Sequence, residues 1–127
     1  MKNFIMNGIL WHLKTVPYYS TELMDRTGNM TLATTDPVTN TIFLSDSVSG
    51  YMKKKVIAHE MGHAACVSYG LISVIRECCK SSRCIEMEEF ICNFVADYGE
   101  EIFERTYEMM GDDALYYMPG YLERLIA

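Results

Sequence analysis

The sequence predicts an α+β fold in one small domain, and three patterns indicate it. Threonine, isoleucine and phenylalanine lie on both sides of a turn cluster within residues 29–46, as in a β-hairpin. Residues 51–69 and 85–105 each carry apolar side chains at helical spacing. A chain of 127 residues is long enough for one hydrophobic core. We therefore expect a single domain, residues 1–127, with a short hairpin or sheet beside two helices and further helices at both ends.

The elements before the long helices are predicted from local spacing. Apolar residues at positions 5, 6, 9, 10 and 13 predict an amphipathic helix over residues 3–14, which Pro17 interrupts. Residues 30–35 and 41–45 are expected to form the strands of the hairpin. The turn between them reads Asp-Pro-Val-Thr-Asn over residues 36–40.

The helix predicted over residues 51–69 carries the motif H-E-x-x-H as His59-Glu60-Met61-Gly62-His63. Four residues advance a helix by about 400°, so His59 and His63 share one face and can bind one zinc ion. Glu60 lies about 100° further round, where it can take a proton from a metal-bound water. A second stripe holds small residues that let another helix approach: Ala58, Gly62 and Ala65. That stripe is equally typical of ordinary tight helix packing.

A third ligand is expected from the helix over residues 85–105. Catalytic zinc usually has three protein ligands, and His12 is the only other histidine in the chain. Glu89 and Asn93 share one face of this second helix. Glu89 can bind the metal, and Asn93 can hydrogen-bond a neighbouring ligand. Two neighbours remain alternatives for the third ligand: Glu86 and Glu88. After this helix, glycine and proline break the chain into short helical pieces over residues 112–126.

These two helices resemble the ImmA/IrrE metallopeptidase family. The first reads H-E-x-G-H, and residues 89–96 read Glu-Phe-Ile-Cys-Asn-Phe-Val-Ala, similar to E-x-x-A-N-x-F-A in the family. Cys92 stands at an alanine position of that pattern and Val95 at a phenylalanine position. The similarity covers about residues 27–104.

The resemblance implies a small zincin-like domain of gluzincin type that binds one Zn²⁺ ion through His59, His63 and Glu89, with Glu60 as general base. It also implies a zinc-dependent endopeptidase that cuts a cytoplasmic regulatory, repressor-like protein of a bacterium or of a mobile element such as a phage. In such peptidases a strand beside the cleft binds the substrate backbone by strand addition. The alternative is a metal-stabilised, non-catalytic protein-interaction module with the same ligands.

Composition argues against several other classes. The net charge of −6 disfavours direct nucleic-acid binding. No apolar run reaches the roughly 18 residues of a membrane span. Residues 1–13 lack a small-residue cleavage site, so we expect no signal peptide and a cytoplasmic protein. The oligomeric state, the substrate with its cleavage site, and any latency of the activity stay open. So does the oxyanion-stabilising residue, with these candidates: His12, Tyr69, Tyr98 and Tyr116.

The five cysteines are expected to be free thiols, because their number is odd and no signal peptide is expected. Cys66 and Cys92 fall within the two long helices and are expected to be small buried side chains. Cys78, Cys79 and Cys84 lie in the connection between these helices. They lack the paired C-x-x-C spacing of a zinc site, and no role is assigned to them.

Overall fold

The computed structural model describes residues 1–115 and groups the chain into two compact units, where the sequence predicts one domain. The first unit is Met1–Asp97 and the second begins at Tyr98, so the boundary falls inside one long helix. All candidate metal ligands lie in the first unit.

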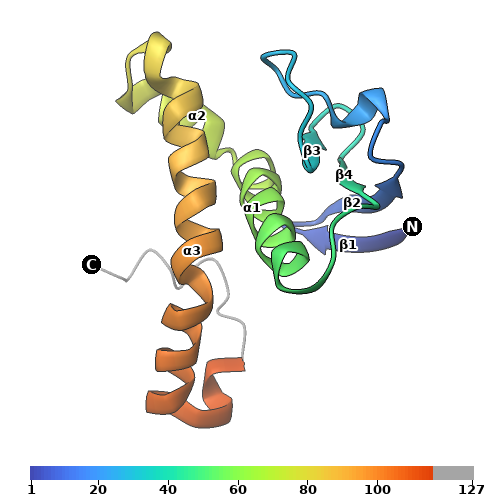
Figure 1. Cartoon of the computed structure of the whole chain (residues 1–127). Coiled ribbons are helices and arrows are strands. Elements are labelled where there is room, and N and C mark those ends of the chain that lie inside the picture. Colours follow the sequence, from blue (N-terminus) through green and yellow to red (C-terminus); the bar gives the residue numbers. More distant parts are fainter. Residues whose placement is uncertain (116–127) are drawn as a thin grey trace. The chain divides into compact units, whose positions relative to one another are not determined.

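A four-stranded mixed sheet forms one side of the first unit (Figure 1). Its strands are β1 (Lys2–Met6), β2 (Ile9–Val16), β3 (Ala33–Asp36) and β4 (Thr41–Ser45), in the spatial order β1-β2-β4-β3. The central strands β2 and β4 run parallel, and the two outer pairs are antiparallel. β3 and β4 form the hairpin expected within residues 29–46. This order leaves β3 at an edge of the sheet.

The prediction of an N-terminal helix over residues 3–14 is wrong, because this segment forms the hairpin β1–β2. Asn7 and Gly8 make its turn with φ of 50° and 75°, the positive values that a two-residue hairpin turn of type I′ requires. Asn-Gly between apolar runs is a strong hairpin signal, and it outweighs the helical spacing of the apolar residues. Strand alternation then places Trp11 on the inner face, where its indole N–H donates to Ser68 Oγ at 2.8 Å.

Within residues 1–115, three α-helices follow the strands: α1 (Gly50–Ser68), α2 (Leu71–Cys78) and α3 (Cys84–Met110). α1 coincides within one residue with the helix predicted over residues 51–69, and α3 continues beyond the predicted end at residue 105. Three short 3-10 helices join or extend these elements: η1 (Thr21–Leu23), η2 (Ser81–Arg83) and η3 (Gly111–Leu115). The rest of the segment predicted as C-terminal helices, residues 116–126, lies outside the described residues. Within residues 1–115, no helix combines the length and hydropathy that crossing a membrane requires.

The hydrophobic core of the first unit lies between α1 and one face of the sheet (Figure 1). Two clusters of buried residues fill it: Trp11, Ile42 and Ala64, and Ala33, Leu44 and Val48. Fully burying a large apolar side chain stabilises a fold by about 1.5–3 kcal/mol, so this interface holds α1 firmly on the sheet. The motif-bearing helix is therefore fixed by ordinary core packing.

The apolar stripe of α3 does not pack inward. Phe90 is 64% exposed and Phe94 47% exposed, whereas Glu88 and Cys92 are the buried residues of this helix. The inner face of α3 is thus the face that carries a carboxylate and a thiol, and the helical spacing of apolar residues does not identify it.

Candidate metal centre

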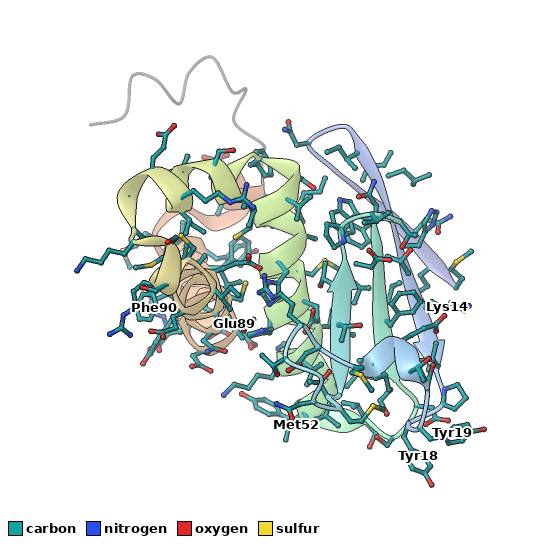
Figure 2. The ribbon with its side chains drawn as sticks, turned by 90° about the horizontal axis from the view of Figure 1, so that it is seen from above. Lys14, Tyr18, Tyr19, Met52, Glu89 and Phe90 are labelled. Atoms are coloured by element: carbon teal, nitrogen blue, oxygen red, sulfur yellow. The ribbon has the colours of Figure 1, made fainter. Side chains whose placement is uncertain are left out.

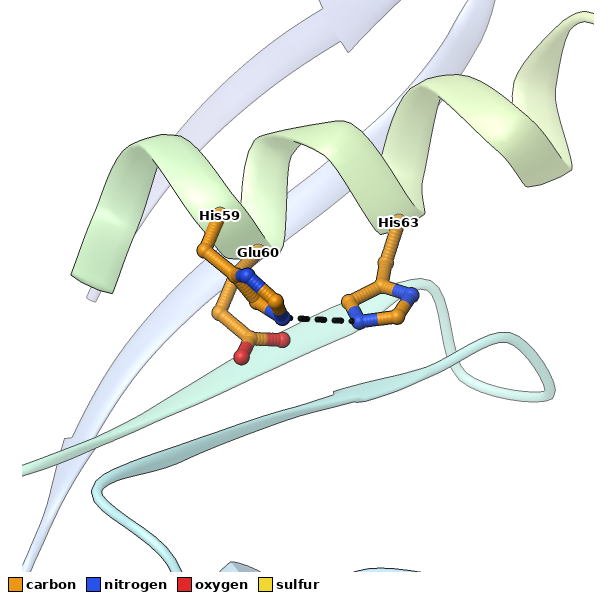
Figure 3. A group of neighbouring side chains, drawn as sticks. All are labelled: His59, Glu60 and His63. Carbon is orange, nitrogen blue, oxygen red and sulfur yellow. Dashed lines mark hydrogen bonds between the residues drawn. The ribbon is translucent and has the colours of Figure 1, made fainter. Parts of the chain in front are cut away.

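α1 brings the two motif histidines together (Figure 3). His59 Nε2 and His63 Nε2 lie 3.2 Å apart, on the side of the helix that the four-residue spacing predicts. His63 is buried and His59 is half-buried. Two imidazole nitrogens this close can bind one metal ion from the same side.

Glu89 adds a carboxylate from α3. Its Oε2 lies 3.2 Å from His59 Nε2, and its Oε1 lies 3.4 Å from His63 Nε2. Figure 2 shows Glu89 on the side of α3 that faces α1, with Phe90 on the outer side. Of the three glutamates considered from the sequence, Glu89 is the one whose oxygens approach both Nε2 atoms.

The separations between these atoms fit a metal ion. Zinc binds imidazole nitrogen and carboxylate oxygen at about 2.0–2.2 Å, so two ligands in a tetrahedral arrangement lie about 3.3–3.6 Å apart. The observed separations between the two Nε2 atoms and the nearest Glu89 oxygens are 3.2–3.4 Å. The donor set, two nitrogens and a carboxylate, is also one that catalytic zinc uses.

Glu88 forms a hydrogen bond with the second ring nitrogen of His63, Nδ1. Its Oε2 is 2.5 Å from His63 Nδ1, on the side of the ring away from His59. An Nδ1–H that donates to this carboxylate leaves Nε2 with its lone pair free for a metal. Arg26 contacts the same carboxylate through both terminal nitrogens, at 3.4 Å and 3.3 Å. Glu88 therefore lies on the Nδ1 side of His63, whereas the oxygens of Glu89 lie near the Nε2 atoms of both histidines.

Burial and charge act on the pKa of His63 in opposite directions. Burial lowers this pKa, but the hydrogen bond to Glu88 and the charges of Glu60, Glu89 and Glu88 outweigh it, so the pKa lies above its usual value. The hydrogen bond to His63 is the main cause that lowers the pKa of Glu88, and Arg26 lowers it further. A metal at Nε2 would therefore compete with protonation of His63.

Glu60 is buried beside the two histidines and is held by the edge strand β3. The hydroxyl of Thr35 donates to Glu60 Oε2 at 2.6 Å. Ligand atoms of Glu60 and the two histidines all lie within 4.8 Å of one another. A carboxylate at this distance can accept a proton from a water bound to the same metal.

A close contact between helices puts Glu89 within reach of α1. A methyl group on Gly62 would lie 3.0 Å from Cys92 Cα and 3.1 Å from its Sγ, closer than such atoms normally approach. Gly62 thus permits the short distance between α1 and α3, as the stripe of small residues predicts. Cys66 and Cys92 are fully buried, as expected.

Several other expectations are not met by the site. The side chain of Asn93 is exposed and makes no hydrogen bond within residues 1–115, and the residue that hydrogen-bonds His63 is Glu88. Glu86 is exposed and pairs with Arg83. His12 follows the inward-facing Trp11 in β2 and hydrogen-bonds Asn3 at 2.7 Å, so it projects from the opposite face of the sheet.

The tyrosines considered for the oxyanion stay predictions. Tyr98 belongs to the second unit, and Tyr116 lies outside the described residues. Among residues 1–115, the His59, Glu60 and His63 group is the cluster that could hold a metal ion, and Cys78, Cys79 and Cys84 form none.

Sequence reasoning missed Arg26 and Thr35. Both lie far from the motif along the chain, in the loop before β3 and in β3 itself. No local pattern marks either residue, because only the pairing of β3 with β4 and the packing of α1 on the sheet bring them to the centre.

The fold and this centre define a class: an α+β protein whose H-E-x-x-H helix and a second helix present two imidazoles and a carboxylate to one point. The chain belongs to the Peptidase_M78 family, since the model of its IrrE N-terminal-like domain matches residues 19–93, more than half of the sequence. This family supports metallopeptidase activity on protein or peptide substrates. No curated protein and no solved structure matches the chain significantly.

Proposed function

We propose that the protein is a zinc-dependent endopeptidase whose single Zn²⁺ is bound by His59, His63 and Glu89. One observation carries the proposal: the two Nε2 atoms and the nearest Glu89 oxygens lie 3.2–3.4 Å apart, the separations expected around one tetrahedral metal. The peptidase family and the H-E-x-x-H motif support it.

The residues of this chain have distinct roles in the proposed reaction. When bound, zinc polarises a carbonyl and lowers the pKa of a coordinated water. Glu60 would accept the proton of the attacking water and would then give it to the leaving amine. Thr35 holds one oxygen of Glu60 in place. Glu88 fixes the ring of His63 so that Nε2 faces the metal.

The substrate is proposed to be a cytoplasmic regulatory protein, by resemblance to the ImmA/IrrE family. Its segment would lie extended along β3, which is an edge strand and carries Thr35 beside Glu60. Main-chain hydrogen bonds to such an edge hold a peptide without demanding a particular sequence.

The alternative, a metal-stabilised interaction module that does not cut its partner, uses the same ligands. Glu60 distinguishes the two functions, since in this proposal it is the base and the ligands are His59, His63 and Glu89. Wild type and Glu60→Gln, both loaded with zinc, would be incubated with a proteome-derived peptide library, and new peptide termini would be counted by mass spectrometry. We expect cleavage by wild type and a 10²–10⁴-fold loss in Glu60→Gln with zinc still bound.

Glu77→Gln is the matched control, because Glu77 is exposed on α2 and forms no ion pair within the described part of the chain. It should cleave as wild type does. Equal cleavage by wild type and Glu60→Gln would contradict the mechanism. Zinc bound in both with cleavage by neither would favour the interaction module.

A further inference from the structure

Arg26 lies at the tip of a loop that its own hydrogen bonds hold in shape. The carboxylate of Asp25 accepts from the backbone N–H of Thr27 at 2.8 Å and of Asn29 at 3.0 Å. The backbone N–H of Asp25 donates to Asn29 O at 2.8 Å. An isolated bridge pairs Met24 with Met30 at the base of this loop. These contacts therefore fix the backbone around Arg26 independently of the contacts that its side chain makes.

The guanidinium of Arg26 joins two neighbouring carboxylates of α3. Its two terminal nitrogens bind the two oxygens of Glu88, at 3.4 Å and 3.3 Å. One of them also lies 3.4 Å from Glu89 Oε1, the oxygen that approaches His63. The planar fork of arginine suits such a two-point contact, which a lysine ammonium does not reproduce.

This contact differs from the surface ion pairs of the molecule. The side chain of Glu88 is only 12% exposed, so its charge needs a partner besides His63. Both partners in the pair of Lys55 with Asp97 are at least 40% exposed, and such pairs contribute little. Arg26 is the arginine or lysine whose ion pairs reach Glu88 and Glu89 among the described residues.

We infer that Arg26 is a positioning residue of the metal centre, which sets the affinity for zinc by holding Glu88 and Glu89 together. Through Glu88 it fixes the ring of His63, and through its second contact it restrains the carboxylate of Glu89. The loop before β3 is thereby tied to the two helices that carry the ligands. This inference rests on the ligand set proposed above.

The test measures zinc affinity in the full chain by competition with a chromophoric chelator. Glu60→Gln serves as the parent, so that binding is measured without hydrolysis. In this parent, Arg26→Met should weaken zinc binding by about 10–100-fold, the usual effect of removing a group that supports a ligand. Arg26→Lys should recover part of the loss, since it restores the charge without the fork.

Arg76→Met is the matched control, because Arg76 lines the same pocket of about 90 Å³ as Arg26 and Glu88 but forms no ion pair within residues 1–115. Its zinc affinity should equal that of the parent. The combined variant Arg26→Met with Glu88→Gln separates positioning from general stability. If Arg26 acts through Glu88, the fold-loss of zinc affinity in the combined variant is smaller than the product of the fold-losses in the two single variants.

The possible results separate a failure of the proposed ligand set from a failure of the role of Arg26. A parent that binds no zinc overturns the ligand set itself. A parent that binds zinc, with Arg26→Met binding equally or more tightly, leaves the proposed function intact and overturns the role of Arg26. Independent losses in the combined variant overturn the action of Arg26 through Glu88, on which the inference mainly rests.

Discussion

α1 and the first part of α3 carry the two halves of the metal centre, but they are held in different ways. α1 packs on the sheet through Trp11, Ile42 and Ala64, so its position follows from a hydrophobic core. α3 leaves Phe90 largely exposed and turns Glu88 inward. Its contacts in the first unit include the close approach at Gly62, the ion pair of Asp97 with Lys55 and the polar contacts of the site itself.

This difference shows that one centre combines two kinds of positioning. The proposed ligands on α1 are positioned by the same burial that stabilises the fold. The proposed ligand on α3, Glu89, is positioned among polar groups of the centre: His59, His63, Glu88 and Arg26. Changes in the core should therefore affect folding, whereas changes around α3 should affect metal binding first.

The largest expected effect contrasts two aromatic residues. Trp11→Ala should lower the free energy of unfolding by about 3–5 kcal/mol, because Trp11 is fully buried against α1. Phe90→Ala should change it by less than about 1 kcal/mol, since Phe90 is 64% exposed. Urea unfolding of both variants measures the difference. Similar losses in the two would show that α3 is held by apolar packing as well.

The next contrast compares two glutamates of α3. Glu88→Gln should weaken zinc binding by about 10–100-fold, because it removes the charged partner of His63 Nδ1. Glu86→Gln should leave the affinity unchanged, since Glu86 is exposed and pairs with Arg83. Chelator competition measures the zinc affinity of both variants. An equal effect of the two changes would show that Glu88 has no specific role in binding zinc.

A smaller effect is expected where the helices touch. Gly62→Ala should destabilise the protein by about 1–2 kcal/mol through overpacking, although alanine is the better helix former. The cause is the backbone of Cys92, 3.0 Å from the added methyl group. Adding Cys92→Ala should recover only part of the loss, because it removes the sulfur but not Cα. A stabilised Gly62→Ala protein would show that the helices lie further apart.

The smallest effect is a pH dependence of the metal-free protein. The pKa of His63 is raised in the folded state, since the hydrogen bond to Glu88 and the nearby carboxylates outweigh burial, which lowers it. Its contribution to stability is therefore fully present below its unfolded pKa of 6.5 and is lost as pH rises through the folded value. The slope for one proton is at most about 1.4 kcal/mol per pH unit.

Zinc affinity should change in the opposite direction and increase over the same pH range, because the metal competes with the proton on His63. Urea unfolding of metal-free wild type at several pH values gives the stability slope. His63→Asn is the control, since it removes the titrating group. An unchanged slope in this variant would assign the pH dependence to another residue.

Local signals predicted part of the fold and brought forward the residues that are proposed as ligands. The Asp-Pro-Val-Thr-Asn turn and the threonine-rich runs predicted the hairpin β3–β4, and apolar spacing predicted α1. The Asn7-Gly8 turn was also readable, but the spacing of the apolar residues around it favours a helix equally well. Neighbouring glutamates on α3 could not be ranked with certainty, because they differ by only about 100° in direction and the inner face of α3 is not its apolar face.

The sequence by itself determined that His59 and His63 share a face and that Glu60 lies beside them, because a helix fixes the direction of residues close along the chain. Only the tertiary structure decided which glutamate faces both histidines, which one supports His63, and that Thr35 and Arg26 belong to the centre. These contacts join residues from separate elements, and their distances depend on strand order and on the approach of α3 at Gly62. No local periodicity encodes such distances.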